Sequence, residues 1–176
     1  MKAMYAQILA ETDQLEGATS VFDDLAATGF AHPTHNVAWL CFCAECAWLC
    51  ARLGRPDCAP GLRSMLEPYA DQLVVGAFAG WVVGSVSFYL GLLSTTVGDW
   101  QQAEVHFAAA AADHERIEAP AWLARTRLEW ARMLITRADP KDGERAHHLL
   151  RQALATAREL GLASVERRAV ELLSSE

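Results

Sequence analysis

The sequence has little positive charge and no segment that resembles a secretion signal. Among its 176 residues, 15 are Lys or Arg and 22 are Asp or Glu, which gives a formal net charge of −7. An acidic chain without a basic stripe is a poor electrostatic match for nucleic acid, so we expect no direct nucleic-acid partner. The opening residues, MKAMYAQILAETDQLEG, lack the apolar core and cleavage site of a signal peptide, and we expect a cytoplasmic protein.

The sequence also lacks the short motifs of common enzymes. It contains no GxSxG, no GxxxxGK[ST] phosphate loop, and no second histidine that would make His114-Glu115 part of HExxH. Successive residues on a helix point in different directions, so neither Asp23-Asp24 nor His147-His148 forms a convergent pair. We therefore expect a protein that is not an enzyme and that has no cofactor and no bound metal.

One long segment carries no charge at all. Residues 73–98, LVVGAFAGWVVGSVSFYLGLLSTTVG, are long enough to span a bilayer. The flanks argue against insertion, because Glu67, Asp71 and Asp99 border the segment and no Lys or Arg lies between residues 63 and 116. We therefore expect no membrane partner and interpret the segment as a helix that is buried on nearly all sides.

What the sequence does contain is a helical repeat. Apolar residues recur at intervals of three and four, and no strand-like alternation is present. Four segments align on an alanine, with a large apolar residue four positions later in three of them and a small or apolar residue seven positions later in all. These three positions form one stripe on a helix. The alanines are Ala18, Ala59, Ala103 and Ala146, and the second segment has Arg63 at the fourth position, so its register is looser.

Each aligned segment is predicted to be the second helix of an antiparallel pair. Glycine and proline punctuate the turns between the two helices. A single pair cannot bury its apolar face, whereas stacked pairs share a continuous core. We predict one all-α domain over residues 1–176, with about four helix pairs and a terminal capping helix. The expected repeats are approximately 1–29, 36–72, 77–117 and 120–160, and the expected cap is 163–174.

The third repeat resembles the tetratricopeptide (TPR) signature, although the period near 43 residues is longer than that family's usual one. The matching positions are Leu90, Gly91, Gly98, Trp100, Ala103, Phe107 and Ala110. Residues 84–162 are also similar to the helical repeat region of large bacterial signalling proteins. Those proteins join it to nucleotide cyclase domains, or to an ATP-binding module and a LuxR-type DNA-binding end. The resemblance implies an α-α superhelix, a right-handed solenoid, that serves protein contact or signal sensing in signalling or transcriptional regulation.

The chain lacks the cyclase, ATP-binding and DNA-binding parts of those proteins. It is therefore interpreted either as part of a larger regulator, whose remainder would be its partner, or as a stand-alone repeat protein.

The segment CFCAECAWLC, residues 41–50, holds four of the five cysteines. The repeat register places Cys43, Cys46 and Cys50 at inward positions of a first helix, where a free cysteine acts as a small hydrophobe. The C-x2-C spacing of Cys43 and Cys46 leaves a zinc site as an alternative, with Cys58 and His35 as the plausible further ligands. A redox role is the third alternative. We favour core packing and place Cys41 on the other, more exposed face.

The same register predicts a concave partner-binding groove lined by the first helices. Its residues are Trp48, Arg52, Phe88, Leu92, Arg125, Leu128 and Arg132. Aromatic residues and arginine dominate binding hot spots. Arg125 and Arg132 lie seven residues apart on one helix face, so they are expected to hold a carboxylate together, unless they only pair with Glu129 or Glu166.

We therefore expect a non-catalytic scaffold that binds a protein or peptide in this groove. The alternative is a small-molecule sensor that holds an apolar ligand between helices near Trp81 and Phe88. A homodimer is also open, because the outer apolar surface of the first helix pair has no neighbour.

Overall fold

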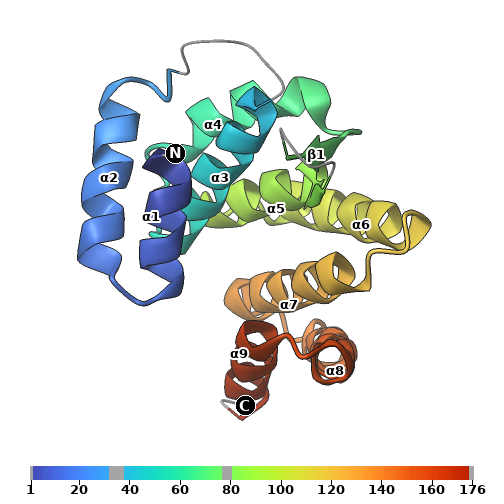
Figure 1. Ribbon diagram of the computed structural model, residues 1–176. Helices are drawn as coiled ribbons and strands as arrows, with labels where there is room; N and C mark the ends of the chain where they lie inside the picture. Colours follow the sequence, from blue (N-terminus) through green and yellow to red (C-terminus); the bar gives the residue numbers. More distant parts are fainter. Residues whose placement is uncertain (1, 32–37, 77–80, 175–176) are drawn as a thin grey trace. The chain divides into compact units, whose positions relative to one another are not determined.

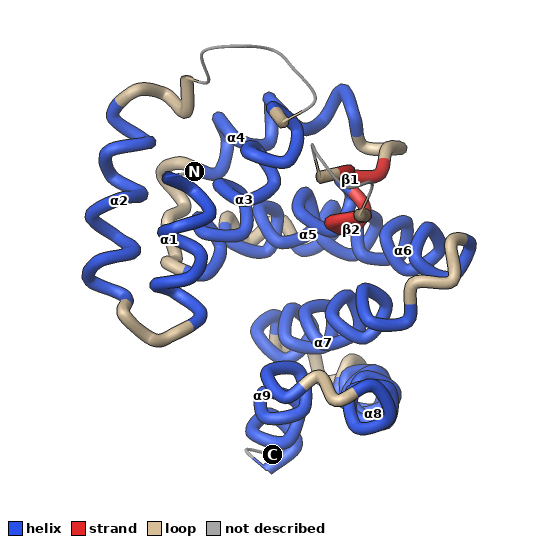
Figure 2. Tube along the Cα trace, viewed as in Figure 1, coloured by secondary structure: helices blue, strands red, loops and turns tan. Residues whose placement is uncertain are grey.

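The computed structural model describes residues 2–31, 38–76 and 81–174, and these residues are mostly helical (Figures 1 and 2). The chain divides into two compact units, residues 1–99 and residues 100–176. The expectation of a single domain stays a prediction, because compactness does not say whether either unit folds alone.

The first unit is built around one central helix. Its α-helices are α1 (Lys2–Glu11), α2 (Leu15–Ala27), α3 (Trp39–Arg52), α4 (Ala59–Leu66) and α5 (Val86–Thr96). Helix α3 contacts α1, α4 and α5, and half of its residues are buried. Because its small Cys and Ala side chains let neighbouring backbones approach, three helices pack around α3.

Helices α1 and α2 form an antiparallel pair (Figure 1). Small residues make the close packing of α1 possible, since Ala3, Ala6 and Ala10 are its buried positions. Gly17 of α2 lies against the Leu9 side chain, which a Cβ at residue 17 would approach to 3.2 Å. The inner face of α1 is therefore made of small residues, and its larger apolar residues lie elsewhere on the helix.

The prediction of one buried helix over residues 73–98 is wrong. Strands β1 (Leu73–Val75) and β2 (Val82–Ser85) form an antiparallel pair, and only α5 in this stretch is helical (Figure 2). β-Branched valines favour strands, and Gly84 has a φ of 96°, which no L-residue adopts readily. Residues 77–80 lie outside the described residues. Among the described residues, no helix is both long enough and apolar enough to cross a membrane.

The second unit consists of helices in its described residues. They are α6 (Trp100–Arg116), α7 (Pro120–Arg137), α8 (Gly143–Leu160) and α9 (Ala163–Ser174). Helix α7 contacts α6, α8 and α9, and α9 also packs on α8. Pro120 opens α7, where its missing N–H would have no helical partner anyway. The bounds of α9 match those expected for the capping helix.

The alanine stripe predicted from the sequence is buried. Ala18, Ala59, Ala103 and Ala146 are all fully buried in α2, α4, α6 and α8. The residues four positions later, Phe22, Phe107 and Leu150, are fully buried as well. Each contributes about 1.5–3 kcal/mol relative to an exposed position. Arg63, the exception, is partly buried and forms an ion pair with Asp99 at 3.2 Å.

The expected third pair, 77–117, does not fall within one unit. Its first helix, α5, belongs to the first unit, and its second, α6, opens the second unit.

Candidate functional site

The predicted groove residues of the first unit differ in exposure. Phe88 and Leu92 on α5 are only 3% and 2% exposed, so their side chains belong to the core. Trp48 on α3 is half-buried, and Arg52 at the end of α3 is exposed and ion-paired with Asp13 at 3.3 Å. Of the predicted groove residues in this unit, only Trp48 and Arg52 are therefore accessible to a partner.

The predicted groove residues of the second unit all lie on α7. Leu128 is buried, whereas Arg125 is exposed and the Arg132 side chain is 36% exposed. The seven predicted residues are thus divided between two units, and it stays a prediction that they form one groove. Arg125 and Arg132, by contrast, lie on the same helix, α7.

Arg125 lies over an aromatic ring. Its guanidinium carbon is 4.9 Å from the centroid of the Trp122 ring, a cation–π contact. Within the described residues, Arg125 has no carboxylate in ion-pair contact. Stacking restrains the side chain but leaves all of its N–H donors without a carboxylate partner.

Arg132 shares a buried carboxylate with a second arginine. Glu129 on α7 has a side chain that is only 8% exposed. Its Oε2 accepts a hydrogen bond from Nε of Arg132 at 2.7 Å. Its Oε1 lies 2.8 Å from Nη2 of Arg168, which comes from α9. The pairing of Arg132 with Glu129, one of the two alternatives from the sequence, is therefore present, whereas Arg168 was not foreseen.

This cluster has a surplus positive charge. Burial by itself raises the pKa of Glu129, but the charges of Arg132 and Arg168 and their hydrogen bonds outweigh burial, so the pKa lies below its ordinary value. One carboxylate thus orients two guanidinium groups, each about one-third exposed. We call Trp122, Arg125, Glu129, Arg132 and Arg168 the α7 arginine surface.

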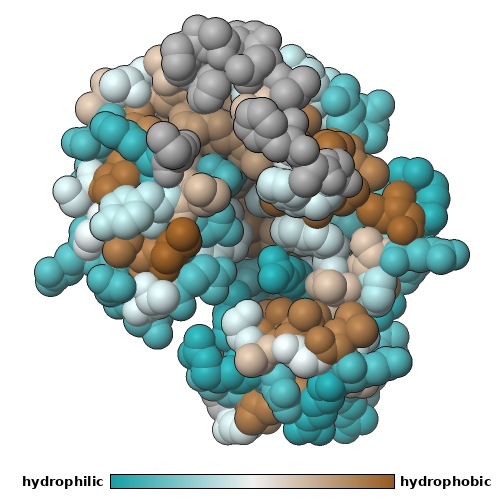
Figure 3. All heavy atoms as spheres, viewed as in Figure 1, coloured by the Kyte–Doolittle hydropathy of each residue, from teal (hydrophilic) through white to brown (hydrophobic). Residues whose placement is uncertain are grey.

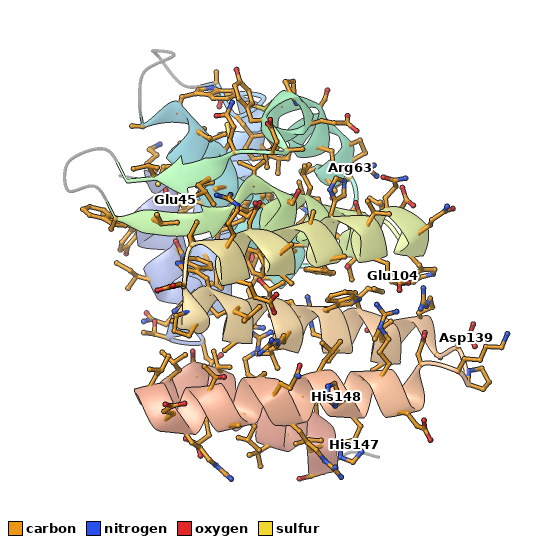
Figure 4. All side chains as sticks on the ribbon, turned by 90° about the vertical axis from the view of Figure 1, so that its right-hand side faces the viewer. Glu45, Arg63, Glu104, Asp139, His147 and His148 are labelled. Atoms are coloured by element: carbon orange, nitrogen blue, oxygen red, sulfur yellow. The ribbon has the colours of Figure 1, made fainter. Side chains whose placement is uncertain are left out.

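A second charge cluster fixes α7 against its neighbours. Arg137 donates two hydrogen bonds to Asp142, from Nε at 2.7 Å and from Nη2 at 2.8 Å, and a third to Glu104 of α6 at 2.9 Å. Glu104 also pairs with Arg145 of α8, whose guanidinium lies 4.7 Å from the centroid of the Trp130 ring. Figure 4 shows Glu104 on the side of α6 that faces α7. This cluster links α6, α7 and α8 at one end of the second unit.

A buried histidine lies beneath Trp122. His114 of α6 is fully buried, and its ring centroid is 5.9 Å from that of Trp122. The Thr126 hydroxyl donates to the Trp122 carbonyl at 3.0 Å, so its oxygen accepts from Nδ1–H of His114, also at 3.0 Å. Burial lowers the pKa of His114 to about 4, and the ring is neutral at pH 7. The histidine therefore supports the Trp122 platform as an uncharged donor.

The cysteine positions agree with the packing interpretation. Cys43, Cys46 and Cys50 are fully buried in α3, as the register predicted, and Cys41 is half-buried. Burial raises the pKa of Cys43 to about 12 and that of Cys50 to about 12, so these thiols stay protonated and unreactive. Among the described residues, which do not include His35, no three His, Cys, Asp or Glu side chains are grouped so as to hold a metal ion.

Trp81 and the pair His147–His148, which were also considered from the sequence, do not form a polar site. The exposed Trp81 indole lies over Gly76, where a Cβ would come within 2.3 Å of the ring. On α8, His147 is half-buried and His148 exposed, and Figure 4 shows them as separate side chains. Neither region gathers polar side chains around a common point.

Comparisons with protein families, with curated proteins and with solved structures give no match to this chain. The expected similarity to TPR proteins stays a prediction, based on the residues of the third repeat. Among the exposed residues, those of the α7 arginine surface have the most distinctive chemistry.

Proposed function

We propose that this protein is a non-catalytic, TPR-like scaffold that binds a protein or peptide partner, in bacterial signalling or transcriptional regulation. In this proposal the helix pairs are TPR-like repeats of a right-handed solenoid, and α9 is its capping helix. The buried alanine stripe in α2, α4, α6 and α8 supports the repeat, because each second helix buries the same register.

The observation that carries the proposal is the α7 arginine surface. Arg125 has no carboxylate partner among the described residues, and Arg132 and Arg168 share a single carboxylate. Arginines that are held in place by stacking or by a buried acid lose little side-chain entropy on binding. Such a surface favours an acidic segment, whose carboxylates would accept the remaining N–H donors.

Seven residues separate Arg125 from Arg132, which is about 10 Å along an α-helix. The partner segment would therefore carry two carboxylates about 10 Å apart. Trp48 and Arg52 of the first unit remain candidate contacts in the same scaffold.

The experiment compares Arg125→Glu with Arg151→Glu as baits for acidic peptides. Arg151 on α8 is also exposed and has no ion pair within the described residues, so it is a matched control. A library of acidic peptides is screened against the unmodified protein, and the best binder is titrated into both variants. We expect Arg125→Glu to weaken binding at least about tenfold and Arg151→Glu to leave it unchanged, since each lost charge-assisted contact is worth about 1.5–3 kcal/mol.

Arg132→Gln is a second variant that tests the contribution of the α7 arginine surface to peptide affinity. It removes the charge but keeps a donor toward Glu129, so it avoids placing an acid beside a buried carboxylate. Equal affinity of the unmodified protein, Arg125→Glu and Arg132→Gln for every acidic peptide would sink the proposal.

A further inference from the structure

A second surface, on the first unit, has the opposite character. Four large apolar side chains of α1 and α2, Met4, Tyr5, Ile8 and Leu15, are between 42% and 56% exposed. Met4, Tyr5 and Ile8 lie on consecutive turns of α1, away from the alanines that face the rest of the unit. Figure 3 shows apolar side chains over α1 and α2 among hydrophilic ones. We call this surface the α1–α2 face.

Acidic residues border the α1–α2 face. Residues 2–27 contain five carboxylates and one basic residue. Three carboxylates are partly neutralised, by pairing with Lys2, Arg52 and Arg55. Glu11 and Glu16 are exposed and make no ion pair within the described residues. The apolar patch therefore has a net negative border.

The outer side of α2 continues this pattern. It carries Leu15 and Glu16 near the start of the helix, followed by Thr19, Ser20, Asp23 and Asp24. An exposed apolar side chain next to the carboxylate of Glu16 suits a side chain with an aliphatic stem and a cationic head, such as Lys or Arg.

We propose that the α1–α2 face binds an amphipathic helix of a partner protein, with apolar residues on one side and Lys or Arg along its flank. The apolar side would cover Met4, Tyr5 and Ile8, and the basic flank would pair with Glu11 and Glu16. An amphipathic helix that docks on such a face uses apolar anchors at helical spacing for affinity and charges for orientation. A second copy of this chain is a poorer occupant, because two acidic borders would then face each other.

The proposal does not depend on the α7 arginine surface, since it uses only residues of the first unit. Its probe is a synthetic 18-residue helical peptide with leucines on one face and lysines along the flank. The matched control peptide has glutamate in place of every lysine. The Tyr5→Glu/Ile8→Glu variant alters the face, and Val105→Glu is the control, because Val105 on α6 has the same 56% exposure as Tyr5.

The dissociation constant of the lysine peptide is measured by fluorescence anisotropy for each variant. We expect Tyr5→Glu/Ile8→Glu to weaken binding at least about tenfold, which corresponds to about 1.4 kcal/mol, and Val105→Glu to leave it unchanged. The glutamate peptide should not bind. A further variant, Glu11→Gln/Glu16→Gln, should weaken binding at low salt and flatten its salt dependence.

Three results would overturn the proposal. The first is equal affinity of the Tyr5→Glu/Ile8→Glu and Val105→Glu variants for the lysine peptide, which would indicate non-specific attraction to an acidic protein. The second is equal affinity for the lysine and glutamate peptides. The third is a dimer in sedimentation that only the Tyr5→Glu/Ile8→Glu variant abolishes, which would assign the face to a second copy.

Discussion

The two units of this chain differ most in how they use charge. Residues 1–99 contain four basic and ten acidic residues, whereas residues 100–176 contain 11 basic and 12 acidic residues. Within the described residues, every basic side chain of the first unit is in an ion pair. In the second unit Arg125, Lys141 and Arg151 have no such partner among the described residues. Carboxylates without an ion pair therefore occur in both units, whereas basic side chains without an ion pair occur, among the described residues, only in the second unit.

The interiors of the two units also differ in how much charge they contain. The central helix of the first unit buries Cys43, Cys46 and Cys50 among small side chains. The second unit adds half-buried ion clusters, around Glu129 and around Arg137, to its apolar contacts. Apolar contacts tolerate small shifts, whereas a multi-arginine cluster requires the helices to keep their positions. We therefore expect the first unit to respond mainly to changes of side-chain volume and the second also to pH.

The largest effect is expected from core substitutions, which test whether the two units unfold independently. Phe22→Ala in the first unit and Phe107→Ala in the second each remove a fully buried ring and should cost about 3–5 kcal/mol. All five cysteines lie at residues 41–58, so thiol labelling reports the first unit alone. If the units unfold separately, Phe22→Ala will accelerate labelling and Phe107→Ala will not.

The control is Val105→Ala, which changes an exposed side chain and should shift stability by less than about 0.5 kcal/mol. Equal acceleration of labelling by Phe22→Ala and Phe107→Ala would show that residues 1–176 unfold as one cooperative unit.

The next effect is the pH dependence that His114 gives the second unit. Its pKa is about 4 in the folded protein and 6.5 for the ordinary side chain, so the unfolded chain binds the proton first as pH falls. The contribution to the free energy of unfolding is complete above pH 6.5 and is lost progressively toward pH 4, by about 3 kcal/mol in total. Denaturant titrations from pH 7 to pH 4 measure the loss.

His114→Gln keeps a hydrogen-bond donor but does not titrate. Its stability should therefore fall less steeply between pH 6.5 and pH 4 than that of the unmodified protein. Identical slopes for the two proteins would contradict the role given to His114.

A smaller effect is expected from Glu129→Gln, which leaves Arg132 and Arg168 without their shared negative charge. We expect a loss of about 2 kcal/mol in the free energy of unfolding, because the partners are one-third exposed and water compensates in part. Thermal unfolding monitored by circular dichroism measures it. Glu171→Gln is the control, since Glu171 and Arg167 form an exposed pair that should contribute no more than about 0.5 kcal/mol. An equal loss in both variants would refute the special role of Glu129.

The smallest effect concerns Arg63, which replaces the large apolar residue of the repeat in α4. Its ion pair with Asp99 lies near the surface, so Arg63→Gln should cost less than about 1 kcal/mol, and less again in high salt. Denaturant midpoints at two salt concentrations test this. A loss above 2 kcal/mol that salt does not reduce would indicate a core role for the aliphatic stem of Arg63.

Much of the helical framework follows from local sequence. The alanine register predicted α2, α4, α6 and α8. Pro120 marked the start of α7, and the turn residues before Gly143 marked the end of α7 and the start of α8. The burial of Cys43, Cys46 and Cys50 followed from the same register. These predictions were correct because helical periodicity is a short-range property, with neighbours three and four residues apart on one face.

The hairpin at residues 73–85 was missed because a short apolar run fits a buried helix and a strand equally well. The valines and Gly84 favour the strand, but only the pairing of β1 with β2 decides between them.

Local sequence was enough to predict the helices of the repeat pairs, their buried stripe and the unequal charge of the two halves. Which charges meet depends instead on how the helices pack: Glu129 pairs with Arg168, 39 residues later, and Glu104 pairs with Arg137 and Arg145. It also decided that Met4, Tyr5 and Ile8 stay exposed while the alanines beside them are buried. Helical periodicity relates residues within one helix. Ion pairs and exposed faces depend on which helices pack together, and no local sequence pattern specifies that packing.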